Sequence, residues 1–368
     1  MKQAFQADEV FTGNETMTDQ VILTENNIIT GILPKEFLPS GYDIRSFPDC
    51  MVTPGFIDLQ LYGGNGKLFS NSLDTESLEA TFAYCVSGGC SHFIITMATN
   101  SMENFLKGIE AAGAYIASGK KGLLGLHLEG PWISKAKKGA HVEAFIKKPI
   151  LKEVELLLEK GKGIIKMITL APEECDDKII SLLMDNGILI SAGHSNATYS
   201  QASHAFEMGV PAATHLFNAM SPLQGREPGM VGAIYDDPNV MSSIICDGVH
   251  VDFASVRLSK KIMGERLFFI TDAVTSIEEG YYHHVFQGNR YTLPDGTLSG
   301  SCMTMMSTFK NAVLQAGIPM EESLKMCTTY PAGLMKDPFL GKIQVGQYAD
   351  FNIIHKKSLE LIASVFHG

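Results

Sequence analysis

The sequence lacks the features that mark secreted and membrane-bound proteins. It contains no C-x-x-C motif, and its seven scattered cysteines are predicted to be reduced and mostly buried. No stretch approaches the roughly 20 apolar residues that a membrane span requires. The N-terminal segment Met1–Asp8 has no apolar core of the kind found in signal peptides. We therefore expect a cytoplasmic protein that does not engage a membrane.

Positive charge is scarce as well. The chain carries 29 Lys and Arg residues against 40 Asp and Glu residues, a formal net charge of −11. No basic cluster exists beyond Lys135, Lys137 and Lys138, so we predict no nucleic-acid partner. An anionic substrate would need a few positive groups gathered locally. Hydrophobic residues make up 45% of the chain, which is enough for a large core and argues against disorder.

Short apolar runs bounded by Gly or polar residues recur along the chain and are typical of buried parallel strands. Helix-like segments lie between them, and two of these end before Gly187 and Gly209. The predicted strands cover 55–60, 92–96, 123–129, 164–170, 188–194, 212–215, 244–247 and 267–272. The predicted helices cover 74–86, 101–117, 152–160, 173–186 and 195–208.

Eight strands that alternate with helices predict an α/β protein with a (β/α)8, TIM-like barrel. A doubly wound open sheet is the alternative, but no G-x-G-x-x-G turn opens a helix here. The two chain ends instead read as strands, including two runs around an Asn26-Asn27 turn. We predict a small β-sandwich domain formed by residues 1–53 and 341–368, and a barrel formed by residues 54–340.

Polar residues able to do chemistry end six of the predicted strands: Gln60, Glu129, His194, His215, Asp247 and Asp272. In a parallel barrel the C-terminal ends of the strands meet at one face, where active sites lie. Glu129, His194 and His215 could together hold a metal ion with a position left open for water. The alternative is three buried polar groups satisfied by backbone partners.

Asp272 is predicted to act as the general base that activates the attacking water and passes its proton to the leaving group. The alternative is an Asp that caps the following loop. His141, Arg226 and His250 lie in loops between the strand ends, and an Arg with a His suits a phosphate or carboxylate. For Arg226 a surface salt bridge is the alternative.

Other groups are predicted to be structural. Tyr62-Gly-Gly-Asn-Gly66 could form an anion-binding nest, but no helix start follows it, so we predict a tight loop. His283 and His284 have no supporting partners in the pattern and are predicted to be structural or surface residues.

Taken together, the motifs resemble the N-acetylglucosamine-6-phosphate deacetylases of the amidohydrolase superfamily, in order from Pro54 to Asp350. The segments that carry the resemblance are Pro54-Gly-Phe-Ile-Asp-Leu-Gln60, His127-Leu-Glu-Gly-Pro131, Lys138-Gly-Ala-His141, Ala192-Gly-His194, Thr214-His-Leu-Phe-Asn-Ala-Met220, Gly225-Arg-Glu-Pro-Gly229, Asp247-Gly-Val-His250, Thr271-Asp272 and Gly296-Thr-Leu-Ser-Gly300. The resemblance implies a homodimer that hydrolyses the sugar acetamide to acetate and glucosamine 6-phosphate.

Carried over by position, the resemblance assigns the metal to Glu129, His194 and His215, and the acid/base role to Asp272. His141 would help to polarise the acetamide carbonyl. The implied contacts with the phosphorylated amino sugar, part of them across the dimer, are Ala140, His141, Asn218, Ala219, Arg226, Asp247, Gly248, Val249, His250, Leu298, Ser299 and Gly300. A His2Glu ligand set suits zinc, which we expect, with iron or cobalt as alternatives.

Two departures from the superfamily pattern affect the interpretation. Many amidohydrolases have His-x-His after the first strand and bind two metals, whereas Asp58-Leu59-Gln60 stands here, so we expect one divalent metal per chain. The stretch 276–289 is shorter than the loop expected after the catalytic Asp, so the sequence does not predict which residues cover the sugar. The galactosamine epimer is an alternative substrate, and a non-catalytic binding protein is a further alternative. The presence of Glu129, His194, His215 and Asp272 together argues against the latter.

Overall fold

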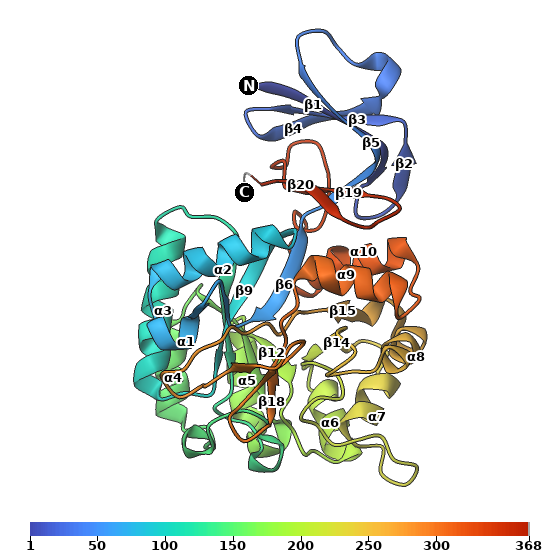
Figure 1. Cartoon of the computed structure of the whole chain (residues 1–368). Coiled ribbons are helices and arrows are strands. Elements are labelled where there is room, and N and C mark those ends of the chain that lie inside the picture. Colours follow the sequence, from blue (N-terminus) through green and yellow to red (C-terminus); the bar gives the residue numbers. More distant parts are fainter. Residues whose placement is uncertain (367–368) are drawn as a thin grey trace.

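The computed structural model describes residues 1–366 and contains two main sheets (Figure 1). The larger one is an eight-stranded parallel barrel sheet surrounded by helices, as predicted. The second collects strands from both chain ends and lies beyond one end of the barrel. The exact domain boundaries stay predictions, and the predicted end at Gly368 lies outside the described residues.

The barrel strands follow chain order around the sheet from β6 to β15, each parallel to its neighbours. They are β6 (Phe56–Leu61), β9 (Cys90–Ala98), β10 (Leu123–Glu129), β11 (Ile165–Leu170), β12 (Leu189–Ala192), β13 (Ala212–Ala213), β14 (Met241–Ile244) and β15 (Leu267–Phe269). Beyond β15, the backbone N–H of Asp272 donates to the carbonyl of Gln60 at 2.9 Å, and that of Tyr62 donates to Ala273 at 2.9 Å. These bonds join the last segment of the barrel to the first strand.

The strand predicted at 244–247 is wrong in position, because the structure places β14 at Met241–Ile244. The apolar run continues through Ile245 and Cys246, which are buried without belonging to the ladder. The carbonyl of Cys246 accepts a hydrogen bond from the Asn311 side chain at 2.9 Å. Burial without strand pairing therefore produced the apolar pattern.

The predicted helices correspond to α2 (Thr75–Ser87), α3 (Met102–Ala117), α4 (Leu151–Lys160), α5 (Asp177–Asp185) and α6 (Tyr199–Glu207). Two of them, α5 and α6, begin four residues later than predicted. Residues 172–174 form a separate 3-10 turn before α5. Helix α6 begins at Tyr199 because Thr198 and Gln201 form a capping box. The remaining helices, α1 (Phe69–Ser72), α7 (Gly229–Asp236), α8 (Phe253–Met263), α9 (Met305–Leu314), α10 (Met320–Cys327) and α11 (Thr329–Leu334), have no counterpart among the predicted ranges.

The chain-end sheet has seven strands and is completed by the C-terminal part of the chain. Strand β19 pairs antiparallel with β5, with Ile353 opposite Val52. Asn26 and Asn27 both adopt positive φ, 49° and 69°, and form the predicted turn between two strands. The strands are β1 (Lys2–Phe11), β2 (Thr16–Thr18), β3 (Gln20–Glu25), β4 (Ile28–Pro34), β5 (Asp43–Pro54), β19 (Phe351–His355) and β20 (Leu361–Val365).

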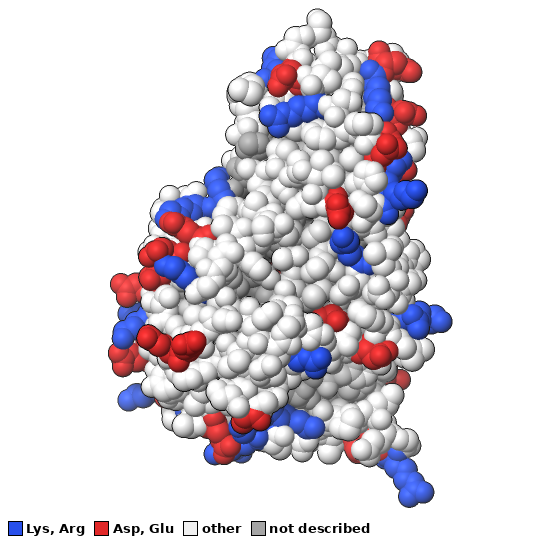
Figure 2. Space-filling view, in the orientation of Figure 1, with Lys and Arg blue, Asp and Glu red and all other residues white. Residues whose placement is uncertain are grey.

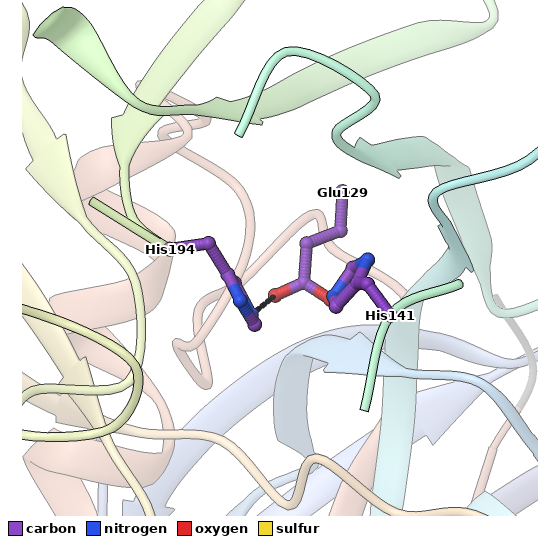
Figure 3. A group of neighbouring side chains, drawn as sticks. All are labelled: Glu129, His141 and His194. Atoms are coloured by element: carbon purple, nitrogen blue, oxygen red, sulfur yellow. Dashed lines mark hydrogen bonds and ion pairs between the residues drawn. The ribbon is translucent and has the colours of Figure 1, made fainter. Parts of the chain in front are cut away.

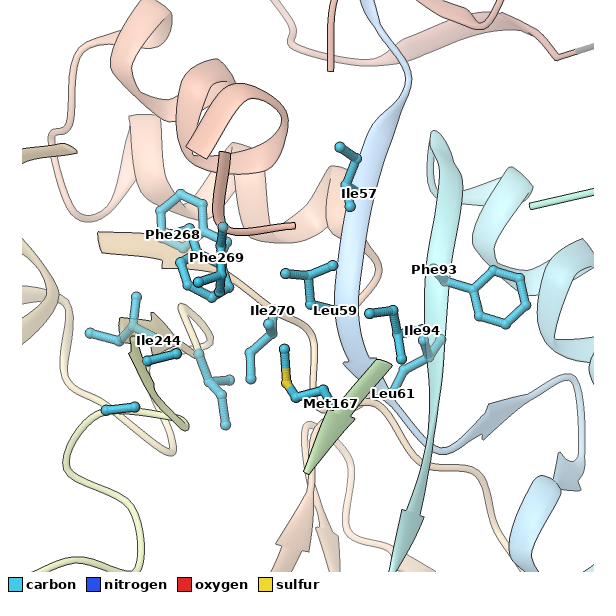
Figure 4. Packing of buried hydrophobic residues seen from close by; sticks show 14 of the residues in the cluster. Ile57, Leu59, Leu61, Phe93, Ile94, Met167, Ile244, Phe268, Phe269 and Ile270 are labelled. Atoms are coloured by element: carbon cyan, nitrogen blue, oxygen red, sulfur yellow. The ribbon is translucent and has the colours of Figure 1, made fainter. Parts of the chain in front are cut away.

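Apolar side chains fill the barrel between its strands. In Figure 4, Leu59, Met167 and Ile270 meet in the interior, and all three belong to one buried cluster. Such packing makes the barrel a solid support for the loops at its C-terminal face. Within residues 1–366, no helix has both the length and the apolar character needed to cross a bilayer.

The segment after Asp272 forms a small sheet of β16 (Val285–Phe286), β17 (Tyr291–Thr292) and β18 (Leu298–Gly300). Residues 276–289 therefore include the first strand of a three-stranded sheet. The predicted tight loop at 62–66 is the hairpin of β7 (Gly63–Gly64) and β8 (Lys67–Leu68), with Asn65 and Gly66 at positive φ.

Candidate active site

Three ligand atoms form a triangle at the C-terminal face of the barrel. Glu129 ends β10, while His194 and His215 follow β12 and β13. Nε2 of His215 lies 3.1 Å from Glu129 Oε1 and 3.1 Å from His194 Nε2, and His194 Nε2 lies 3.3 Å from the same oxygen. Ligands about 2.0–2.2 Å from one tetrahedral ion lie roughly 3.3–3.6 Å apart. The triangle therefore fits a single small divalent cation.

The two imidazoles of this triangle are held differently. His194 Nδ1 lies 2.8 Å from the backbone carbonyl of Lys137 and donates to it, which leaves the Nε2 lone pair free for a metal. His215 Nδ1 is buried and has no hydrogen-bond partner within residues 1–366. Both residues adopt positive φ, 46° and 35°, a strained backbone conformation that is common at functional sites.

His141 lies on the other side of the Glu129 carboxylate from His194 (Figure 3). Glu129, His141 and His194 are also close enough to hold a metal. However, the backbone N–H of Thr99 donates to His141 Nδ1 at 3.2 Å, so in the neutral ring Nε2 carries the proton. That Nε2 faces Glu129 Oε2 at 3.1 Å and acts as a donor. The tautomer favours His215 as the third ligand and leaves His141 as a hydrogen-bond donor.

Gln60 and Tyr62 also contact Glu129, and neither offers an imidazole. Gln60 Nε2 donates to Glu129 Oε1 at 3.0 Å and to Asp272 Oδ1 at 2.9 Å. The Tyr62 hydroxyl donates to Glu129 Oε2. The strand-end pair that faces the site is therefore 60 and 62, which corrects the alignment of His-x-His with Asp58-Leu59-Gln60. Asp58 instead accepts hydrogen bonds from Thr271.

The electrostatics of the two carboxyl groups differ. Burial alone would raise the pKa of Glu129, but the imidazoles of His194 and His141 hold it well below its usual value. Burial raises the pKa of Asp272, and the neighbouring Glu129 carboxylate adds to this effect. Asp272 keeps Oδ1 bonded to Gln60 and lines the same cavity as the triangle. A carboxyl group with a raised pKa is suited to exchanging protons near neutrality.

Most of the predicted site residues line one cavity of about 250 Å³. It contains the predicted residues Glu129, Ala140, His141, His194, His215, Asn218, Ala219, His250, Asp272, Leu298, Ser299 and Gly300. Asp247, Gly248 and Val249 do not line it. Asp247 positions His250 instead, with Oδ2 at 2.6 Å from its Nδ1. Arg226 is exposed and lies outside the cavity.

Comparison with known proteins supports the resemblance over the whole chain. The sequence profile of the amidohydrolase family matches residues 51–367. N-acetylglucosamine-6-phosphate deacetylase from Haemophilus influenzae is 34% identical over 100% of this chain and 99% of its own length. The chain belongs to the amidohydrolase family, among its N-acetylglucosamine-6-phosphate deacetylases. The crystal structure of that deacetylase from Pasteurella multocida superposes with a TM-score of 0.95 at 33% identity, covering 100% of this chain and 99% of the other.

A second kind of deacetylase is equally similar in identity. N-acetylgalactosamine-6-phosphate deacetylase from Shewanella sp. (strain ANA-3) is 34% identical over 81% of this chain and 77% of its own length. Family membership therefore shows the amidohydrolase chemistry of this enzyme, while the sugar needs a separate argument.

Among the cavity residues of this amidohydrolase that were not predicted as functional are the ring-bearing side chains of Tyr62, Tyr282 and His284. Tyr62 stands two residues after Gln60 and so shares its face of the strand, a signal that was available in the sequence. Tyr282 and His284 lie just before β16, and they are held at the cavity by the sheet of β16, β17 and β18 and by bonds to Thr99 and Ser299. The prediction that His284 is a structural or surface residue did not place it in the cavity. No short sequence pattern reports such a long-range contact.

Proposed function

We propose that this enzyme hydrolyses the acetamide of N-acetyl-D-glucosamine 6-phosphate to D-glucosamine 6-phosphate and acetate. The observation that carries the proposal is the triangle of Glu129, His194 and His215, with Asp272 beside it in one cavity. One divalent metal per chain, with zinc expected, would be held by these three residues. When bound, such a cation supplies Lewis acidity and lowers the pKa of a water molecule.

The protein groups then have separate roles. Asp272 accepts a proton from the attacking water and delivers it to the sugar nitrogen as the C–N bond breaks. When the sugar binds, His141 turns its Nε2–H from Glu129 Oε2 to the acetamide oxygen, and its Nδ1 stays an acceptor for Thr99. Gln60 orients Asp272 through the bond to Oδ1. The atoms and charges balance: one water adds, both of its protons end on the sugar nitrogen, and acetate and the protonated amine leave.

The phosphate needs groups that the cavity of one chain does not supply. No Lys or Arg lines the cavity within the described residues. On the face shown in Figure 2, positive and negative side chains are interspersed without a continuous patch of either sign. We propose a homodimer in which Arg226 of one chain reaches the cavity of the other chain. There it would bind the phosphate together with His250 of that cavity. Seven free cysteines suit the reducing cytoplasm in which we place the enzyme.

The galactosamine 6-phosphate epimer is a second candidate substrate, favoured by the Shewanella relative. We rank the glucosamine sugar first, because the Haemophilus relative matches over the full length of both chains. The two sugars differ in the orientation of one hydroxyl group, so the polar groups of the cavity must distinguish them.

The test is acetate release from four substrates: the N-acetyl derivatives of glucosamine and galactosamine, each with and without the 6-phosphate. Metal content is measured on the same sample. We expect the highest kcat/KM with N-acetylglucosamine 6-phosphate and one metal per chain. A higher kcat/KM with the galactosamine 6-phosphate would assign the alternative function. Binding of these sugars without acetate release from metal-loaded protein would indicate a non-catalytic protein.

A further inference from the structure

His284 lines the active-site cavity and has one ring nitrogen without a protein partner among the described residues. Its side chain is 5% exposed and lines the cavity together with Ser299 and Leu298. Nδ1 lies 3.0 Å from the Ser299 hydroxyl. Nε2 has no hydrogen-bond partner within the described residues, and it is not among their fully buried unpaired atoms. An unpaired ring nitrogen on a residue that lines a ligand cavity is available to a bound substrate.

The His284 ring is also held in position on its other sides. It stacks on the Tyr282 ring at 6.3 Å between centroids, with 13° between the planes. The Tyr282 hydroxyl donates to the backbone carbonyl of Thr99, the residue that also sets the tautomer of His141. The same anchor therefore supports His284 and the donor proposed for the acetamide carbonyl.

The chemistry of His284 suits a hydroxyl group better than a phosphate. Burial lowers the pKa of His284 to about 4, so the ring is neutral near pH 7. If Ser299 donates to Nδ1, then Nε2 is a donor, and if Nδ1 donates to Ser299, then Nε2 is an acceptor. A sugar hydroxyl can satisfy either tautomer because it both donates and accepts. An ionised phosphate only accepts, so it could meet Nε2 in one tautomer alone, and a neutral ring offers it no opposite charge.

We propose that His284 is a specificity-determining residue whose Nε2 hydrogen-bonds a free ring hydroxyl, at C3 or C4, of the amino sugar. This inference rests on the proposed function and adds a substrate contact that the motif comparison did not assign. Sites that hydrogen-bond a substrate hydroxyl discriminate strongly against analogues without it, because a buried polar group is then left unpaired. His284 would thus contribute to the choice of sugar.

Two variants of His284 separate the substrate contact from the contact with Ser299. In His284→Asn, the amide stands near the former Nδ1 and can still meet Ser299, but nothing replaces Nε2. In His284→Gln, the longer side chain brings an amide to the former place of Nε2. The matched control is His283→Asn, because His283 is more exposed, lies outside the cavity and bonds the carbonyl of Gly280.

The measurement is kcat/KM for acetate release from N-acetylglucosamine 6-phosphate and from its 3-deoxy and 4-deoxy analogues. Metal content and thermal unfolding are recorded for every variant. We expect His284→Asn to lose about tenfold on the parent sugar, as one neutral hydrogen bond would predict. His284→Gln should recover most of this loss, and His283→Asn should match the wild type. On one of the two deoxy sugars, wild type and His284→Asn should become equal.

The results that would contradict the role of His284 differ from the result that would contradict the proposed function. Undiminished kcat/KM of His284→Asn on the parent sugar would overturn the proposal. So would an equal loss on the parent and both deoxy sugars, because His284 would then act only through the fold. If the wild-type, metal-loaded enzyme released no acetate from any of the phosphorylated sugars, the proposed function itself would fail.

Discussion

The two oxygens of the Glu129 carboxylate face different partners. Oε1 points to His194 and His215 and accepts from Gln60, while Oε2 interacts with the Tyr62 hydroxyl and with His141. Both oxygens are thus held in place, and a lone pair of Oε1 remains for a metal. Hydrogen bonds of this kind orient a ligand and tune its affinity for the metal.

We expect Tyr62→Phe to weaken metal binding by about 10- to 100-fold, because a hydrogen bond to the ligand carboxylate is lost. Competition with a chelator on the purified protein measures this. Tyr42→Phe is the matched control, since it removes a hydrogen bond from Tyr42 to Glu25, at 2.7 Å, in the chain-end sheet. Equal metal affinity of both variants would show that Tyr62 does not position Glu129.

Asp272→Asn keeps the size of the side chain and its bond to Gln60 but removes the proton carrier. General acid/base groups contribute about 10²–10⁴-fold, and we expect kcat to fall by that amount with metal content unchanged. The exposed Asp185→Asn serves as the control. Near-normal turnover of Asp272→Asn would place the base elsewhere.

For single residues, the sequence located those that end a parallel strand or follow it within three positions. Glu129, His194, His215 and Asp272 converge because the strand ends share one face. Their chemical roles stay predictions. Tyr282 and His284 were beyond reach, because their approach to the cavity depends on pairing within a loop that carries no periodic pattern.

At the level of elements, the junction between β6 and residues 271–273 completes the barrel. Few backbone hydrogen bonds join the two segments. The Asp58 carboxylate adds two more, because it accepts from the backbone N–H and from the hydroxyl of Thr271. Asp58 is fully buried, and burial raises its pKa to about 7. The closing contact of the barrel therefore includes a carboxyl group that titrates near neutrality.

This pKa predicts a pH dependence of stability with a definite sign. Between pH 3.8, the ordinary value, and about 7, folded Asp58 holds a proton that the unfolded chain has released. The free energy of unfolding therefore falls as the pH rises through this window. Asp58→Asn does not titrate, so its stability relative to wild type should increase by a few kcal/mol between pH 4 and pH 8.

Urea unfolding at several pH values measures this difference. Asp185→Asn should run parallel to the wild type at every pH, since its side chain is exposed. A constant difference between Asp58→Asn and wild type would show that Asp58 has no raised pKa.

The elements were predicted best where a local signal ends them. Helix α5 ends before Gly187, which adopts φ of 77°, and α6 ends before Gly209, with φ of 105°. Strand β14 was misplaced because apolar residues continue beyond its end at Ile244. Buried loop residues and paired strand residues have the same apolar composition. Only the presence of a neighbouring strand distinguishes them.

For the whole molecule, the sequence predicted the barrel and the sheet built from both chain ends. It could not show that Arg226 is exposed and apart from the cavity of its own chain. An acidic enzyme that binds an anionic sugar must gather positive charge at its site. We therefore expect Arg226 to act at the cavity of a second chain.

Arg226→Ala should raise KM for the phosphorylated sugar at least tenfold and leave the weak activity on the unphosphorylated sugar almost unchanged. Arg45→Ala, an exposed arginine of the chain-end sheet, is the control. Mixing Arg226→Ala chains with Asp272→Asn chains should restore activity in hybrid dimers. No recovery in demonstrated hybrids would exclude a shared site, and equal loss on both sugars would make Arg226 structural.

The sheet built from both chain ends also constrains how the protein is made. Strand β5 ends at Pro54, but its partner β19 begins only at Phe351, about 300 residues later. At roughly 5–20 residues per second, a ribosome needs about 15–60 seconds to synthesise the intervening chain. During that time one edge of β5 remains unpaired, and such an edge can pair with another chain. The N-terminal sheet of the nascent enzyme therefore stays open to aggregation until the last strands of the chain have been synthesised.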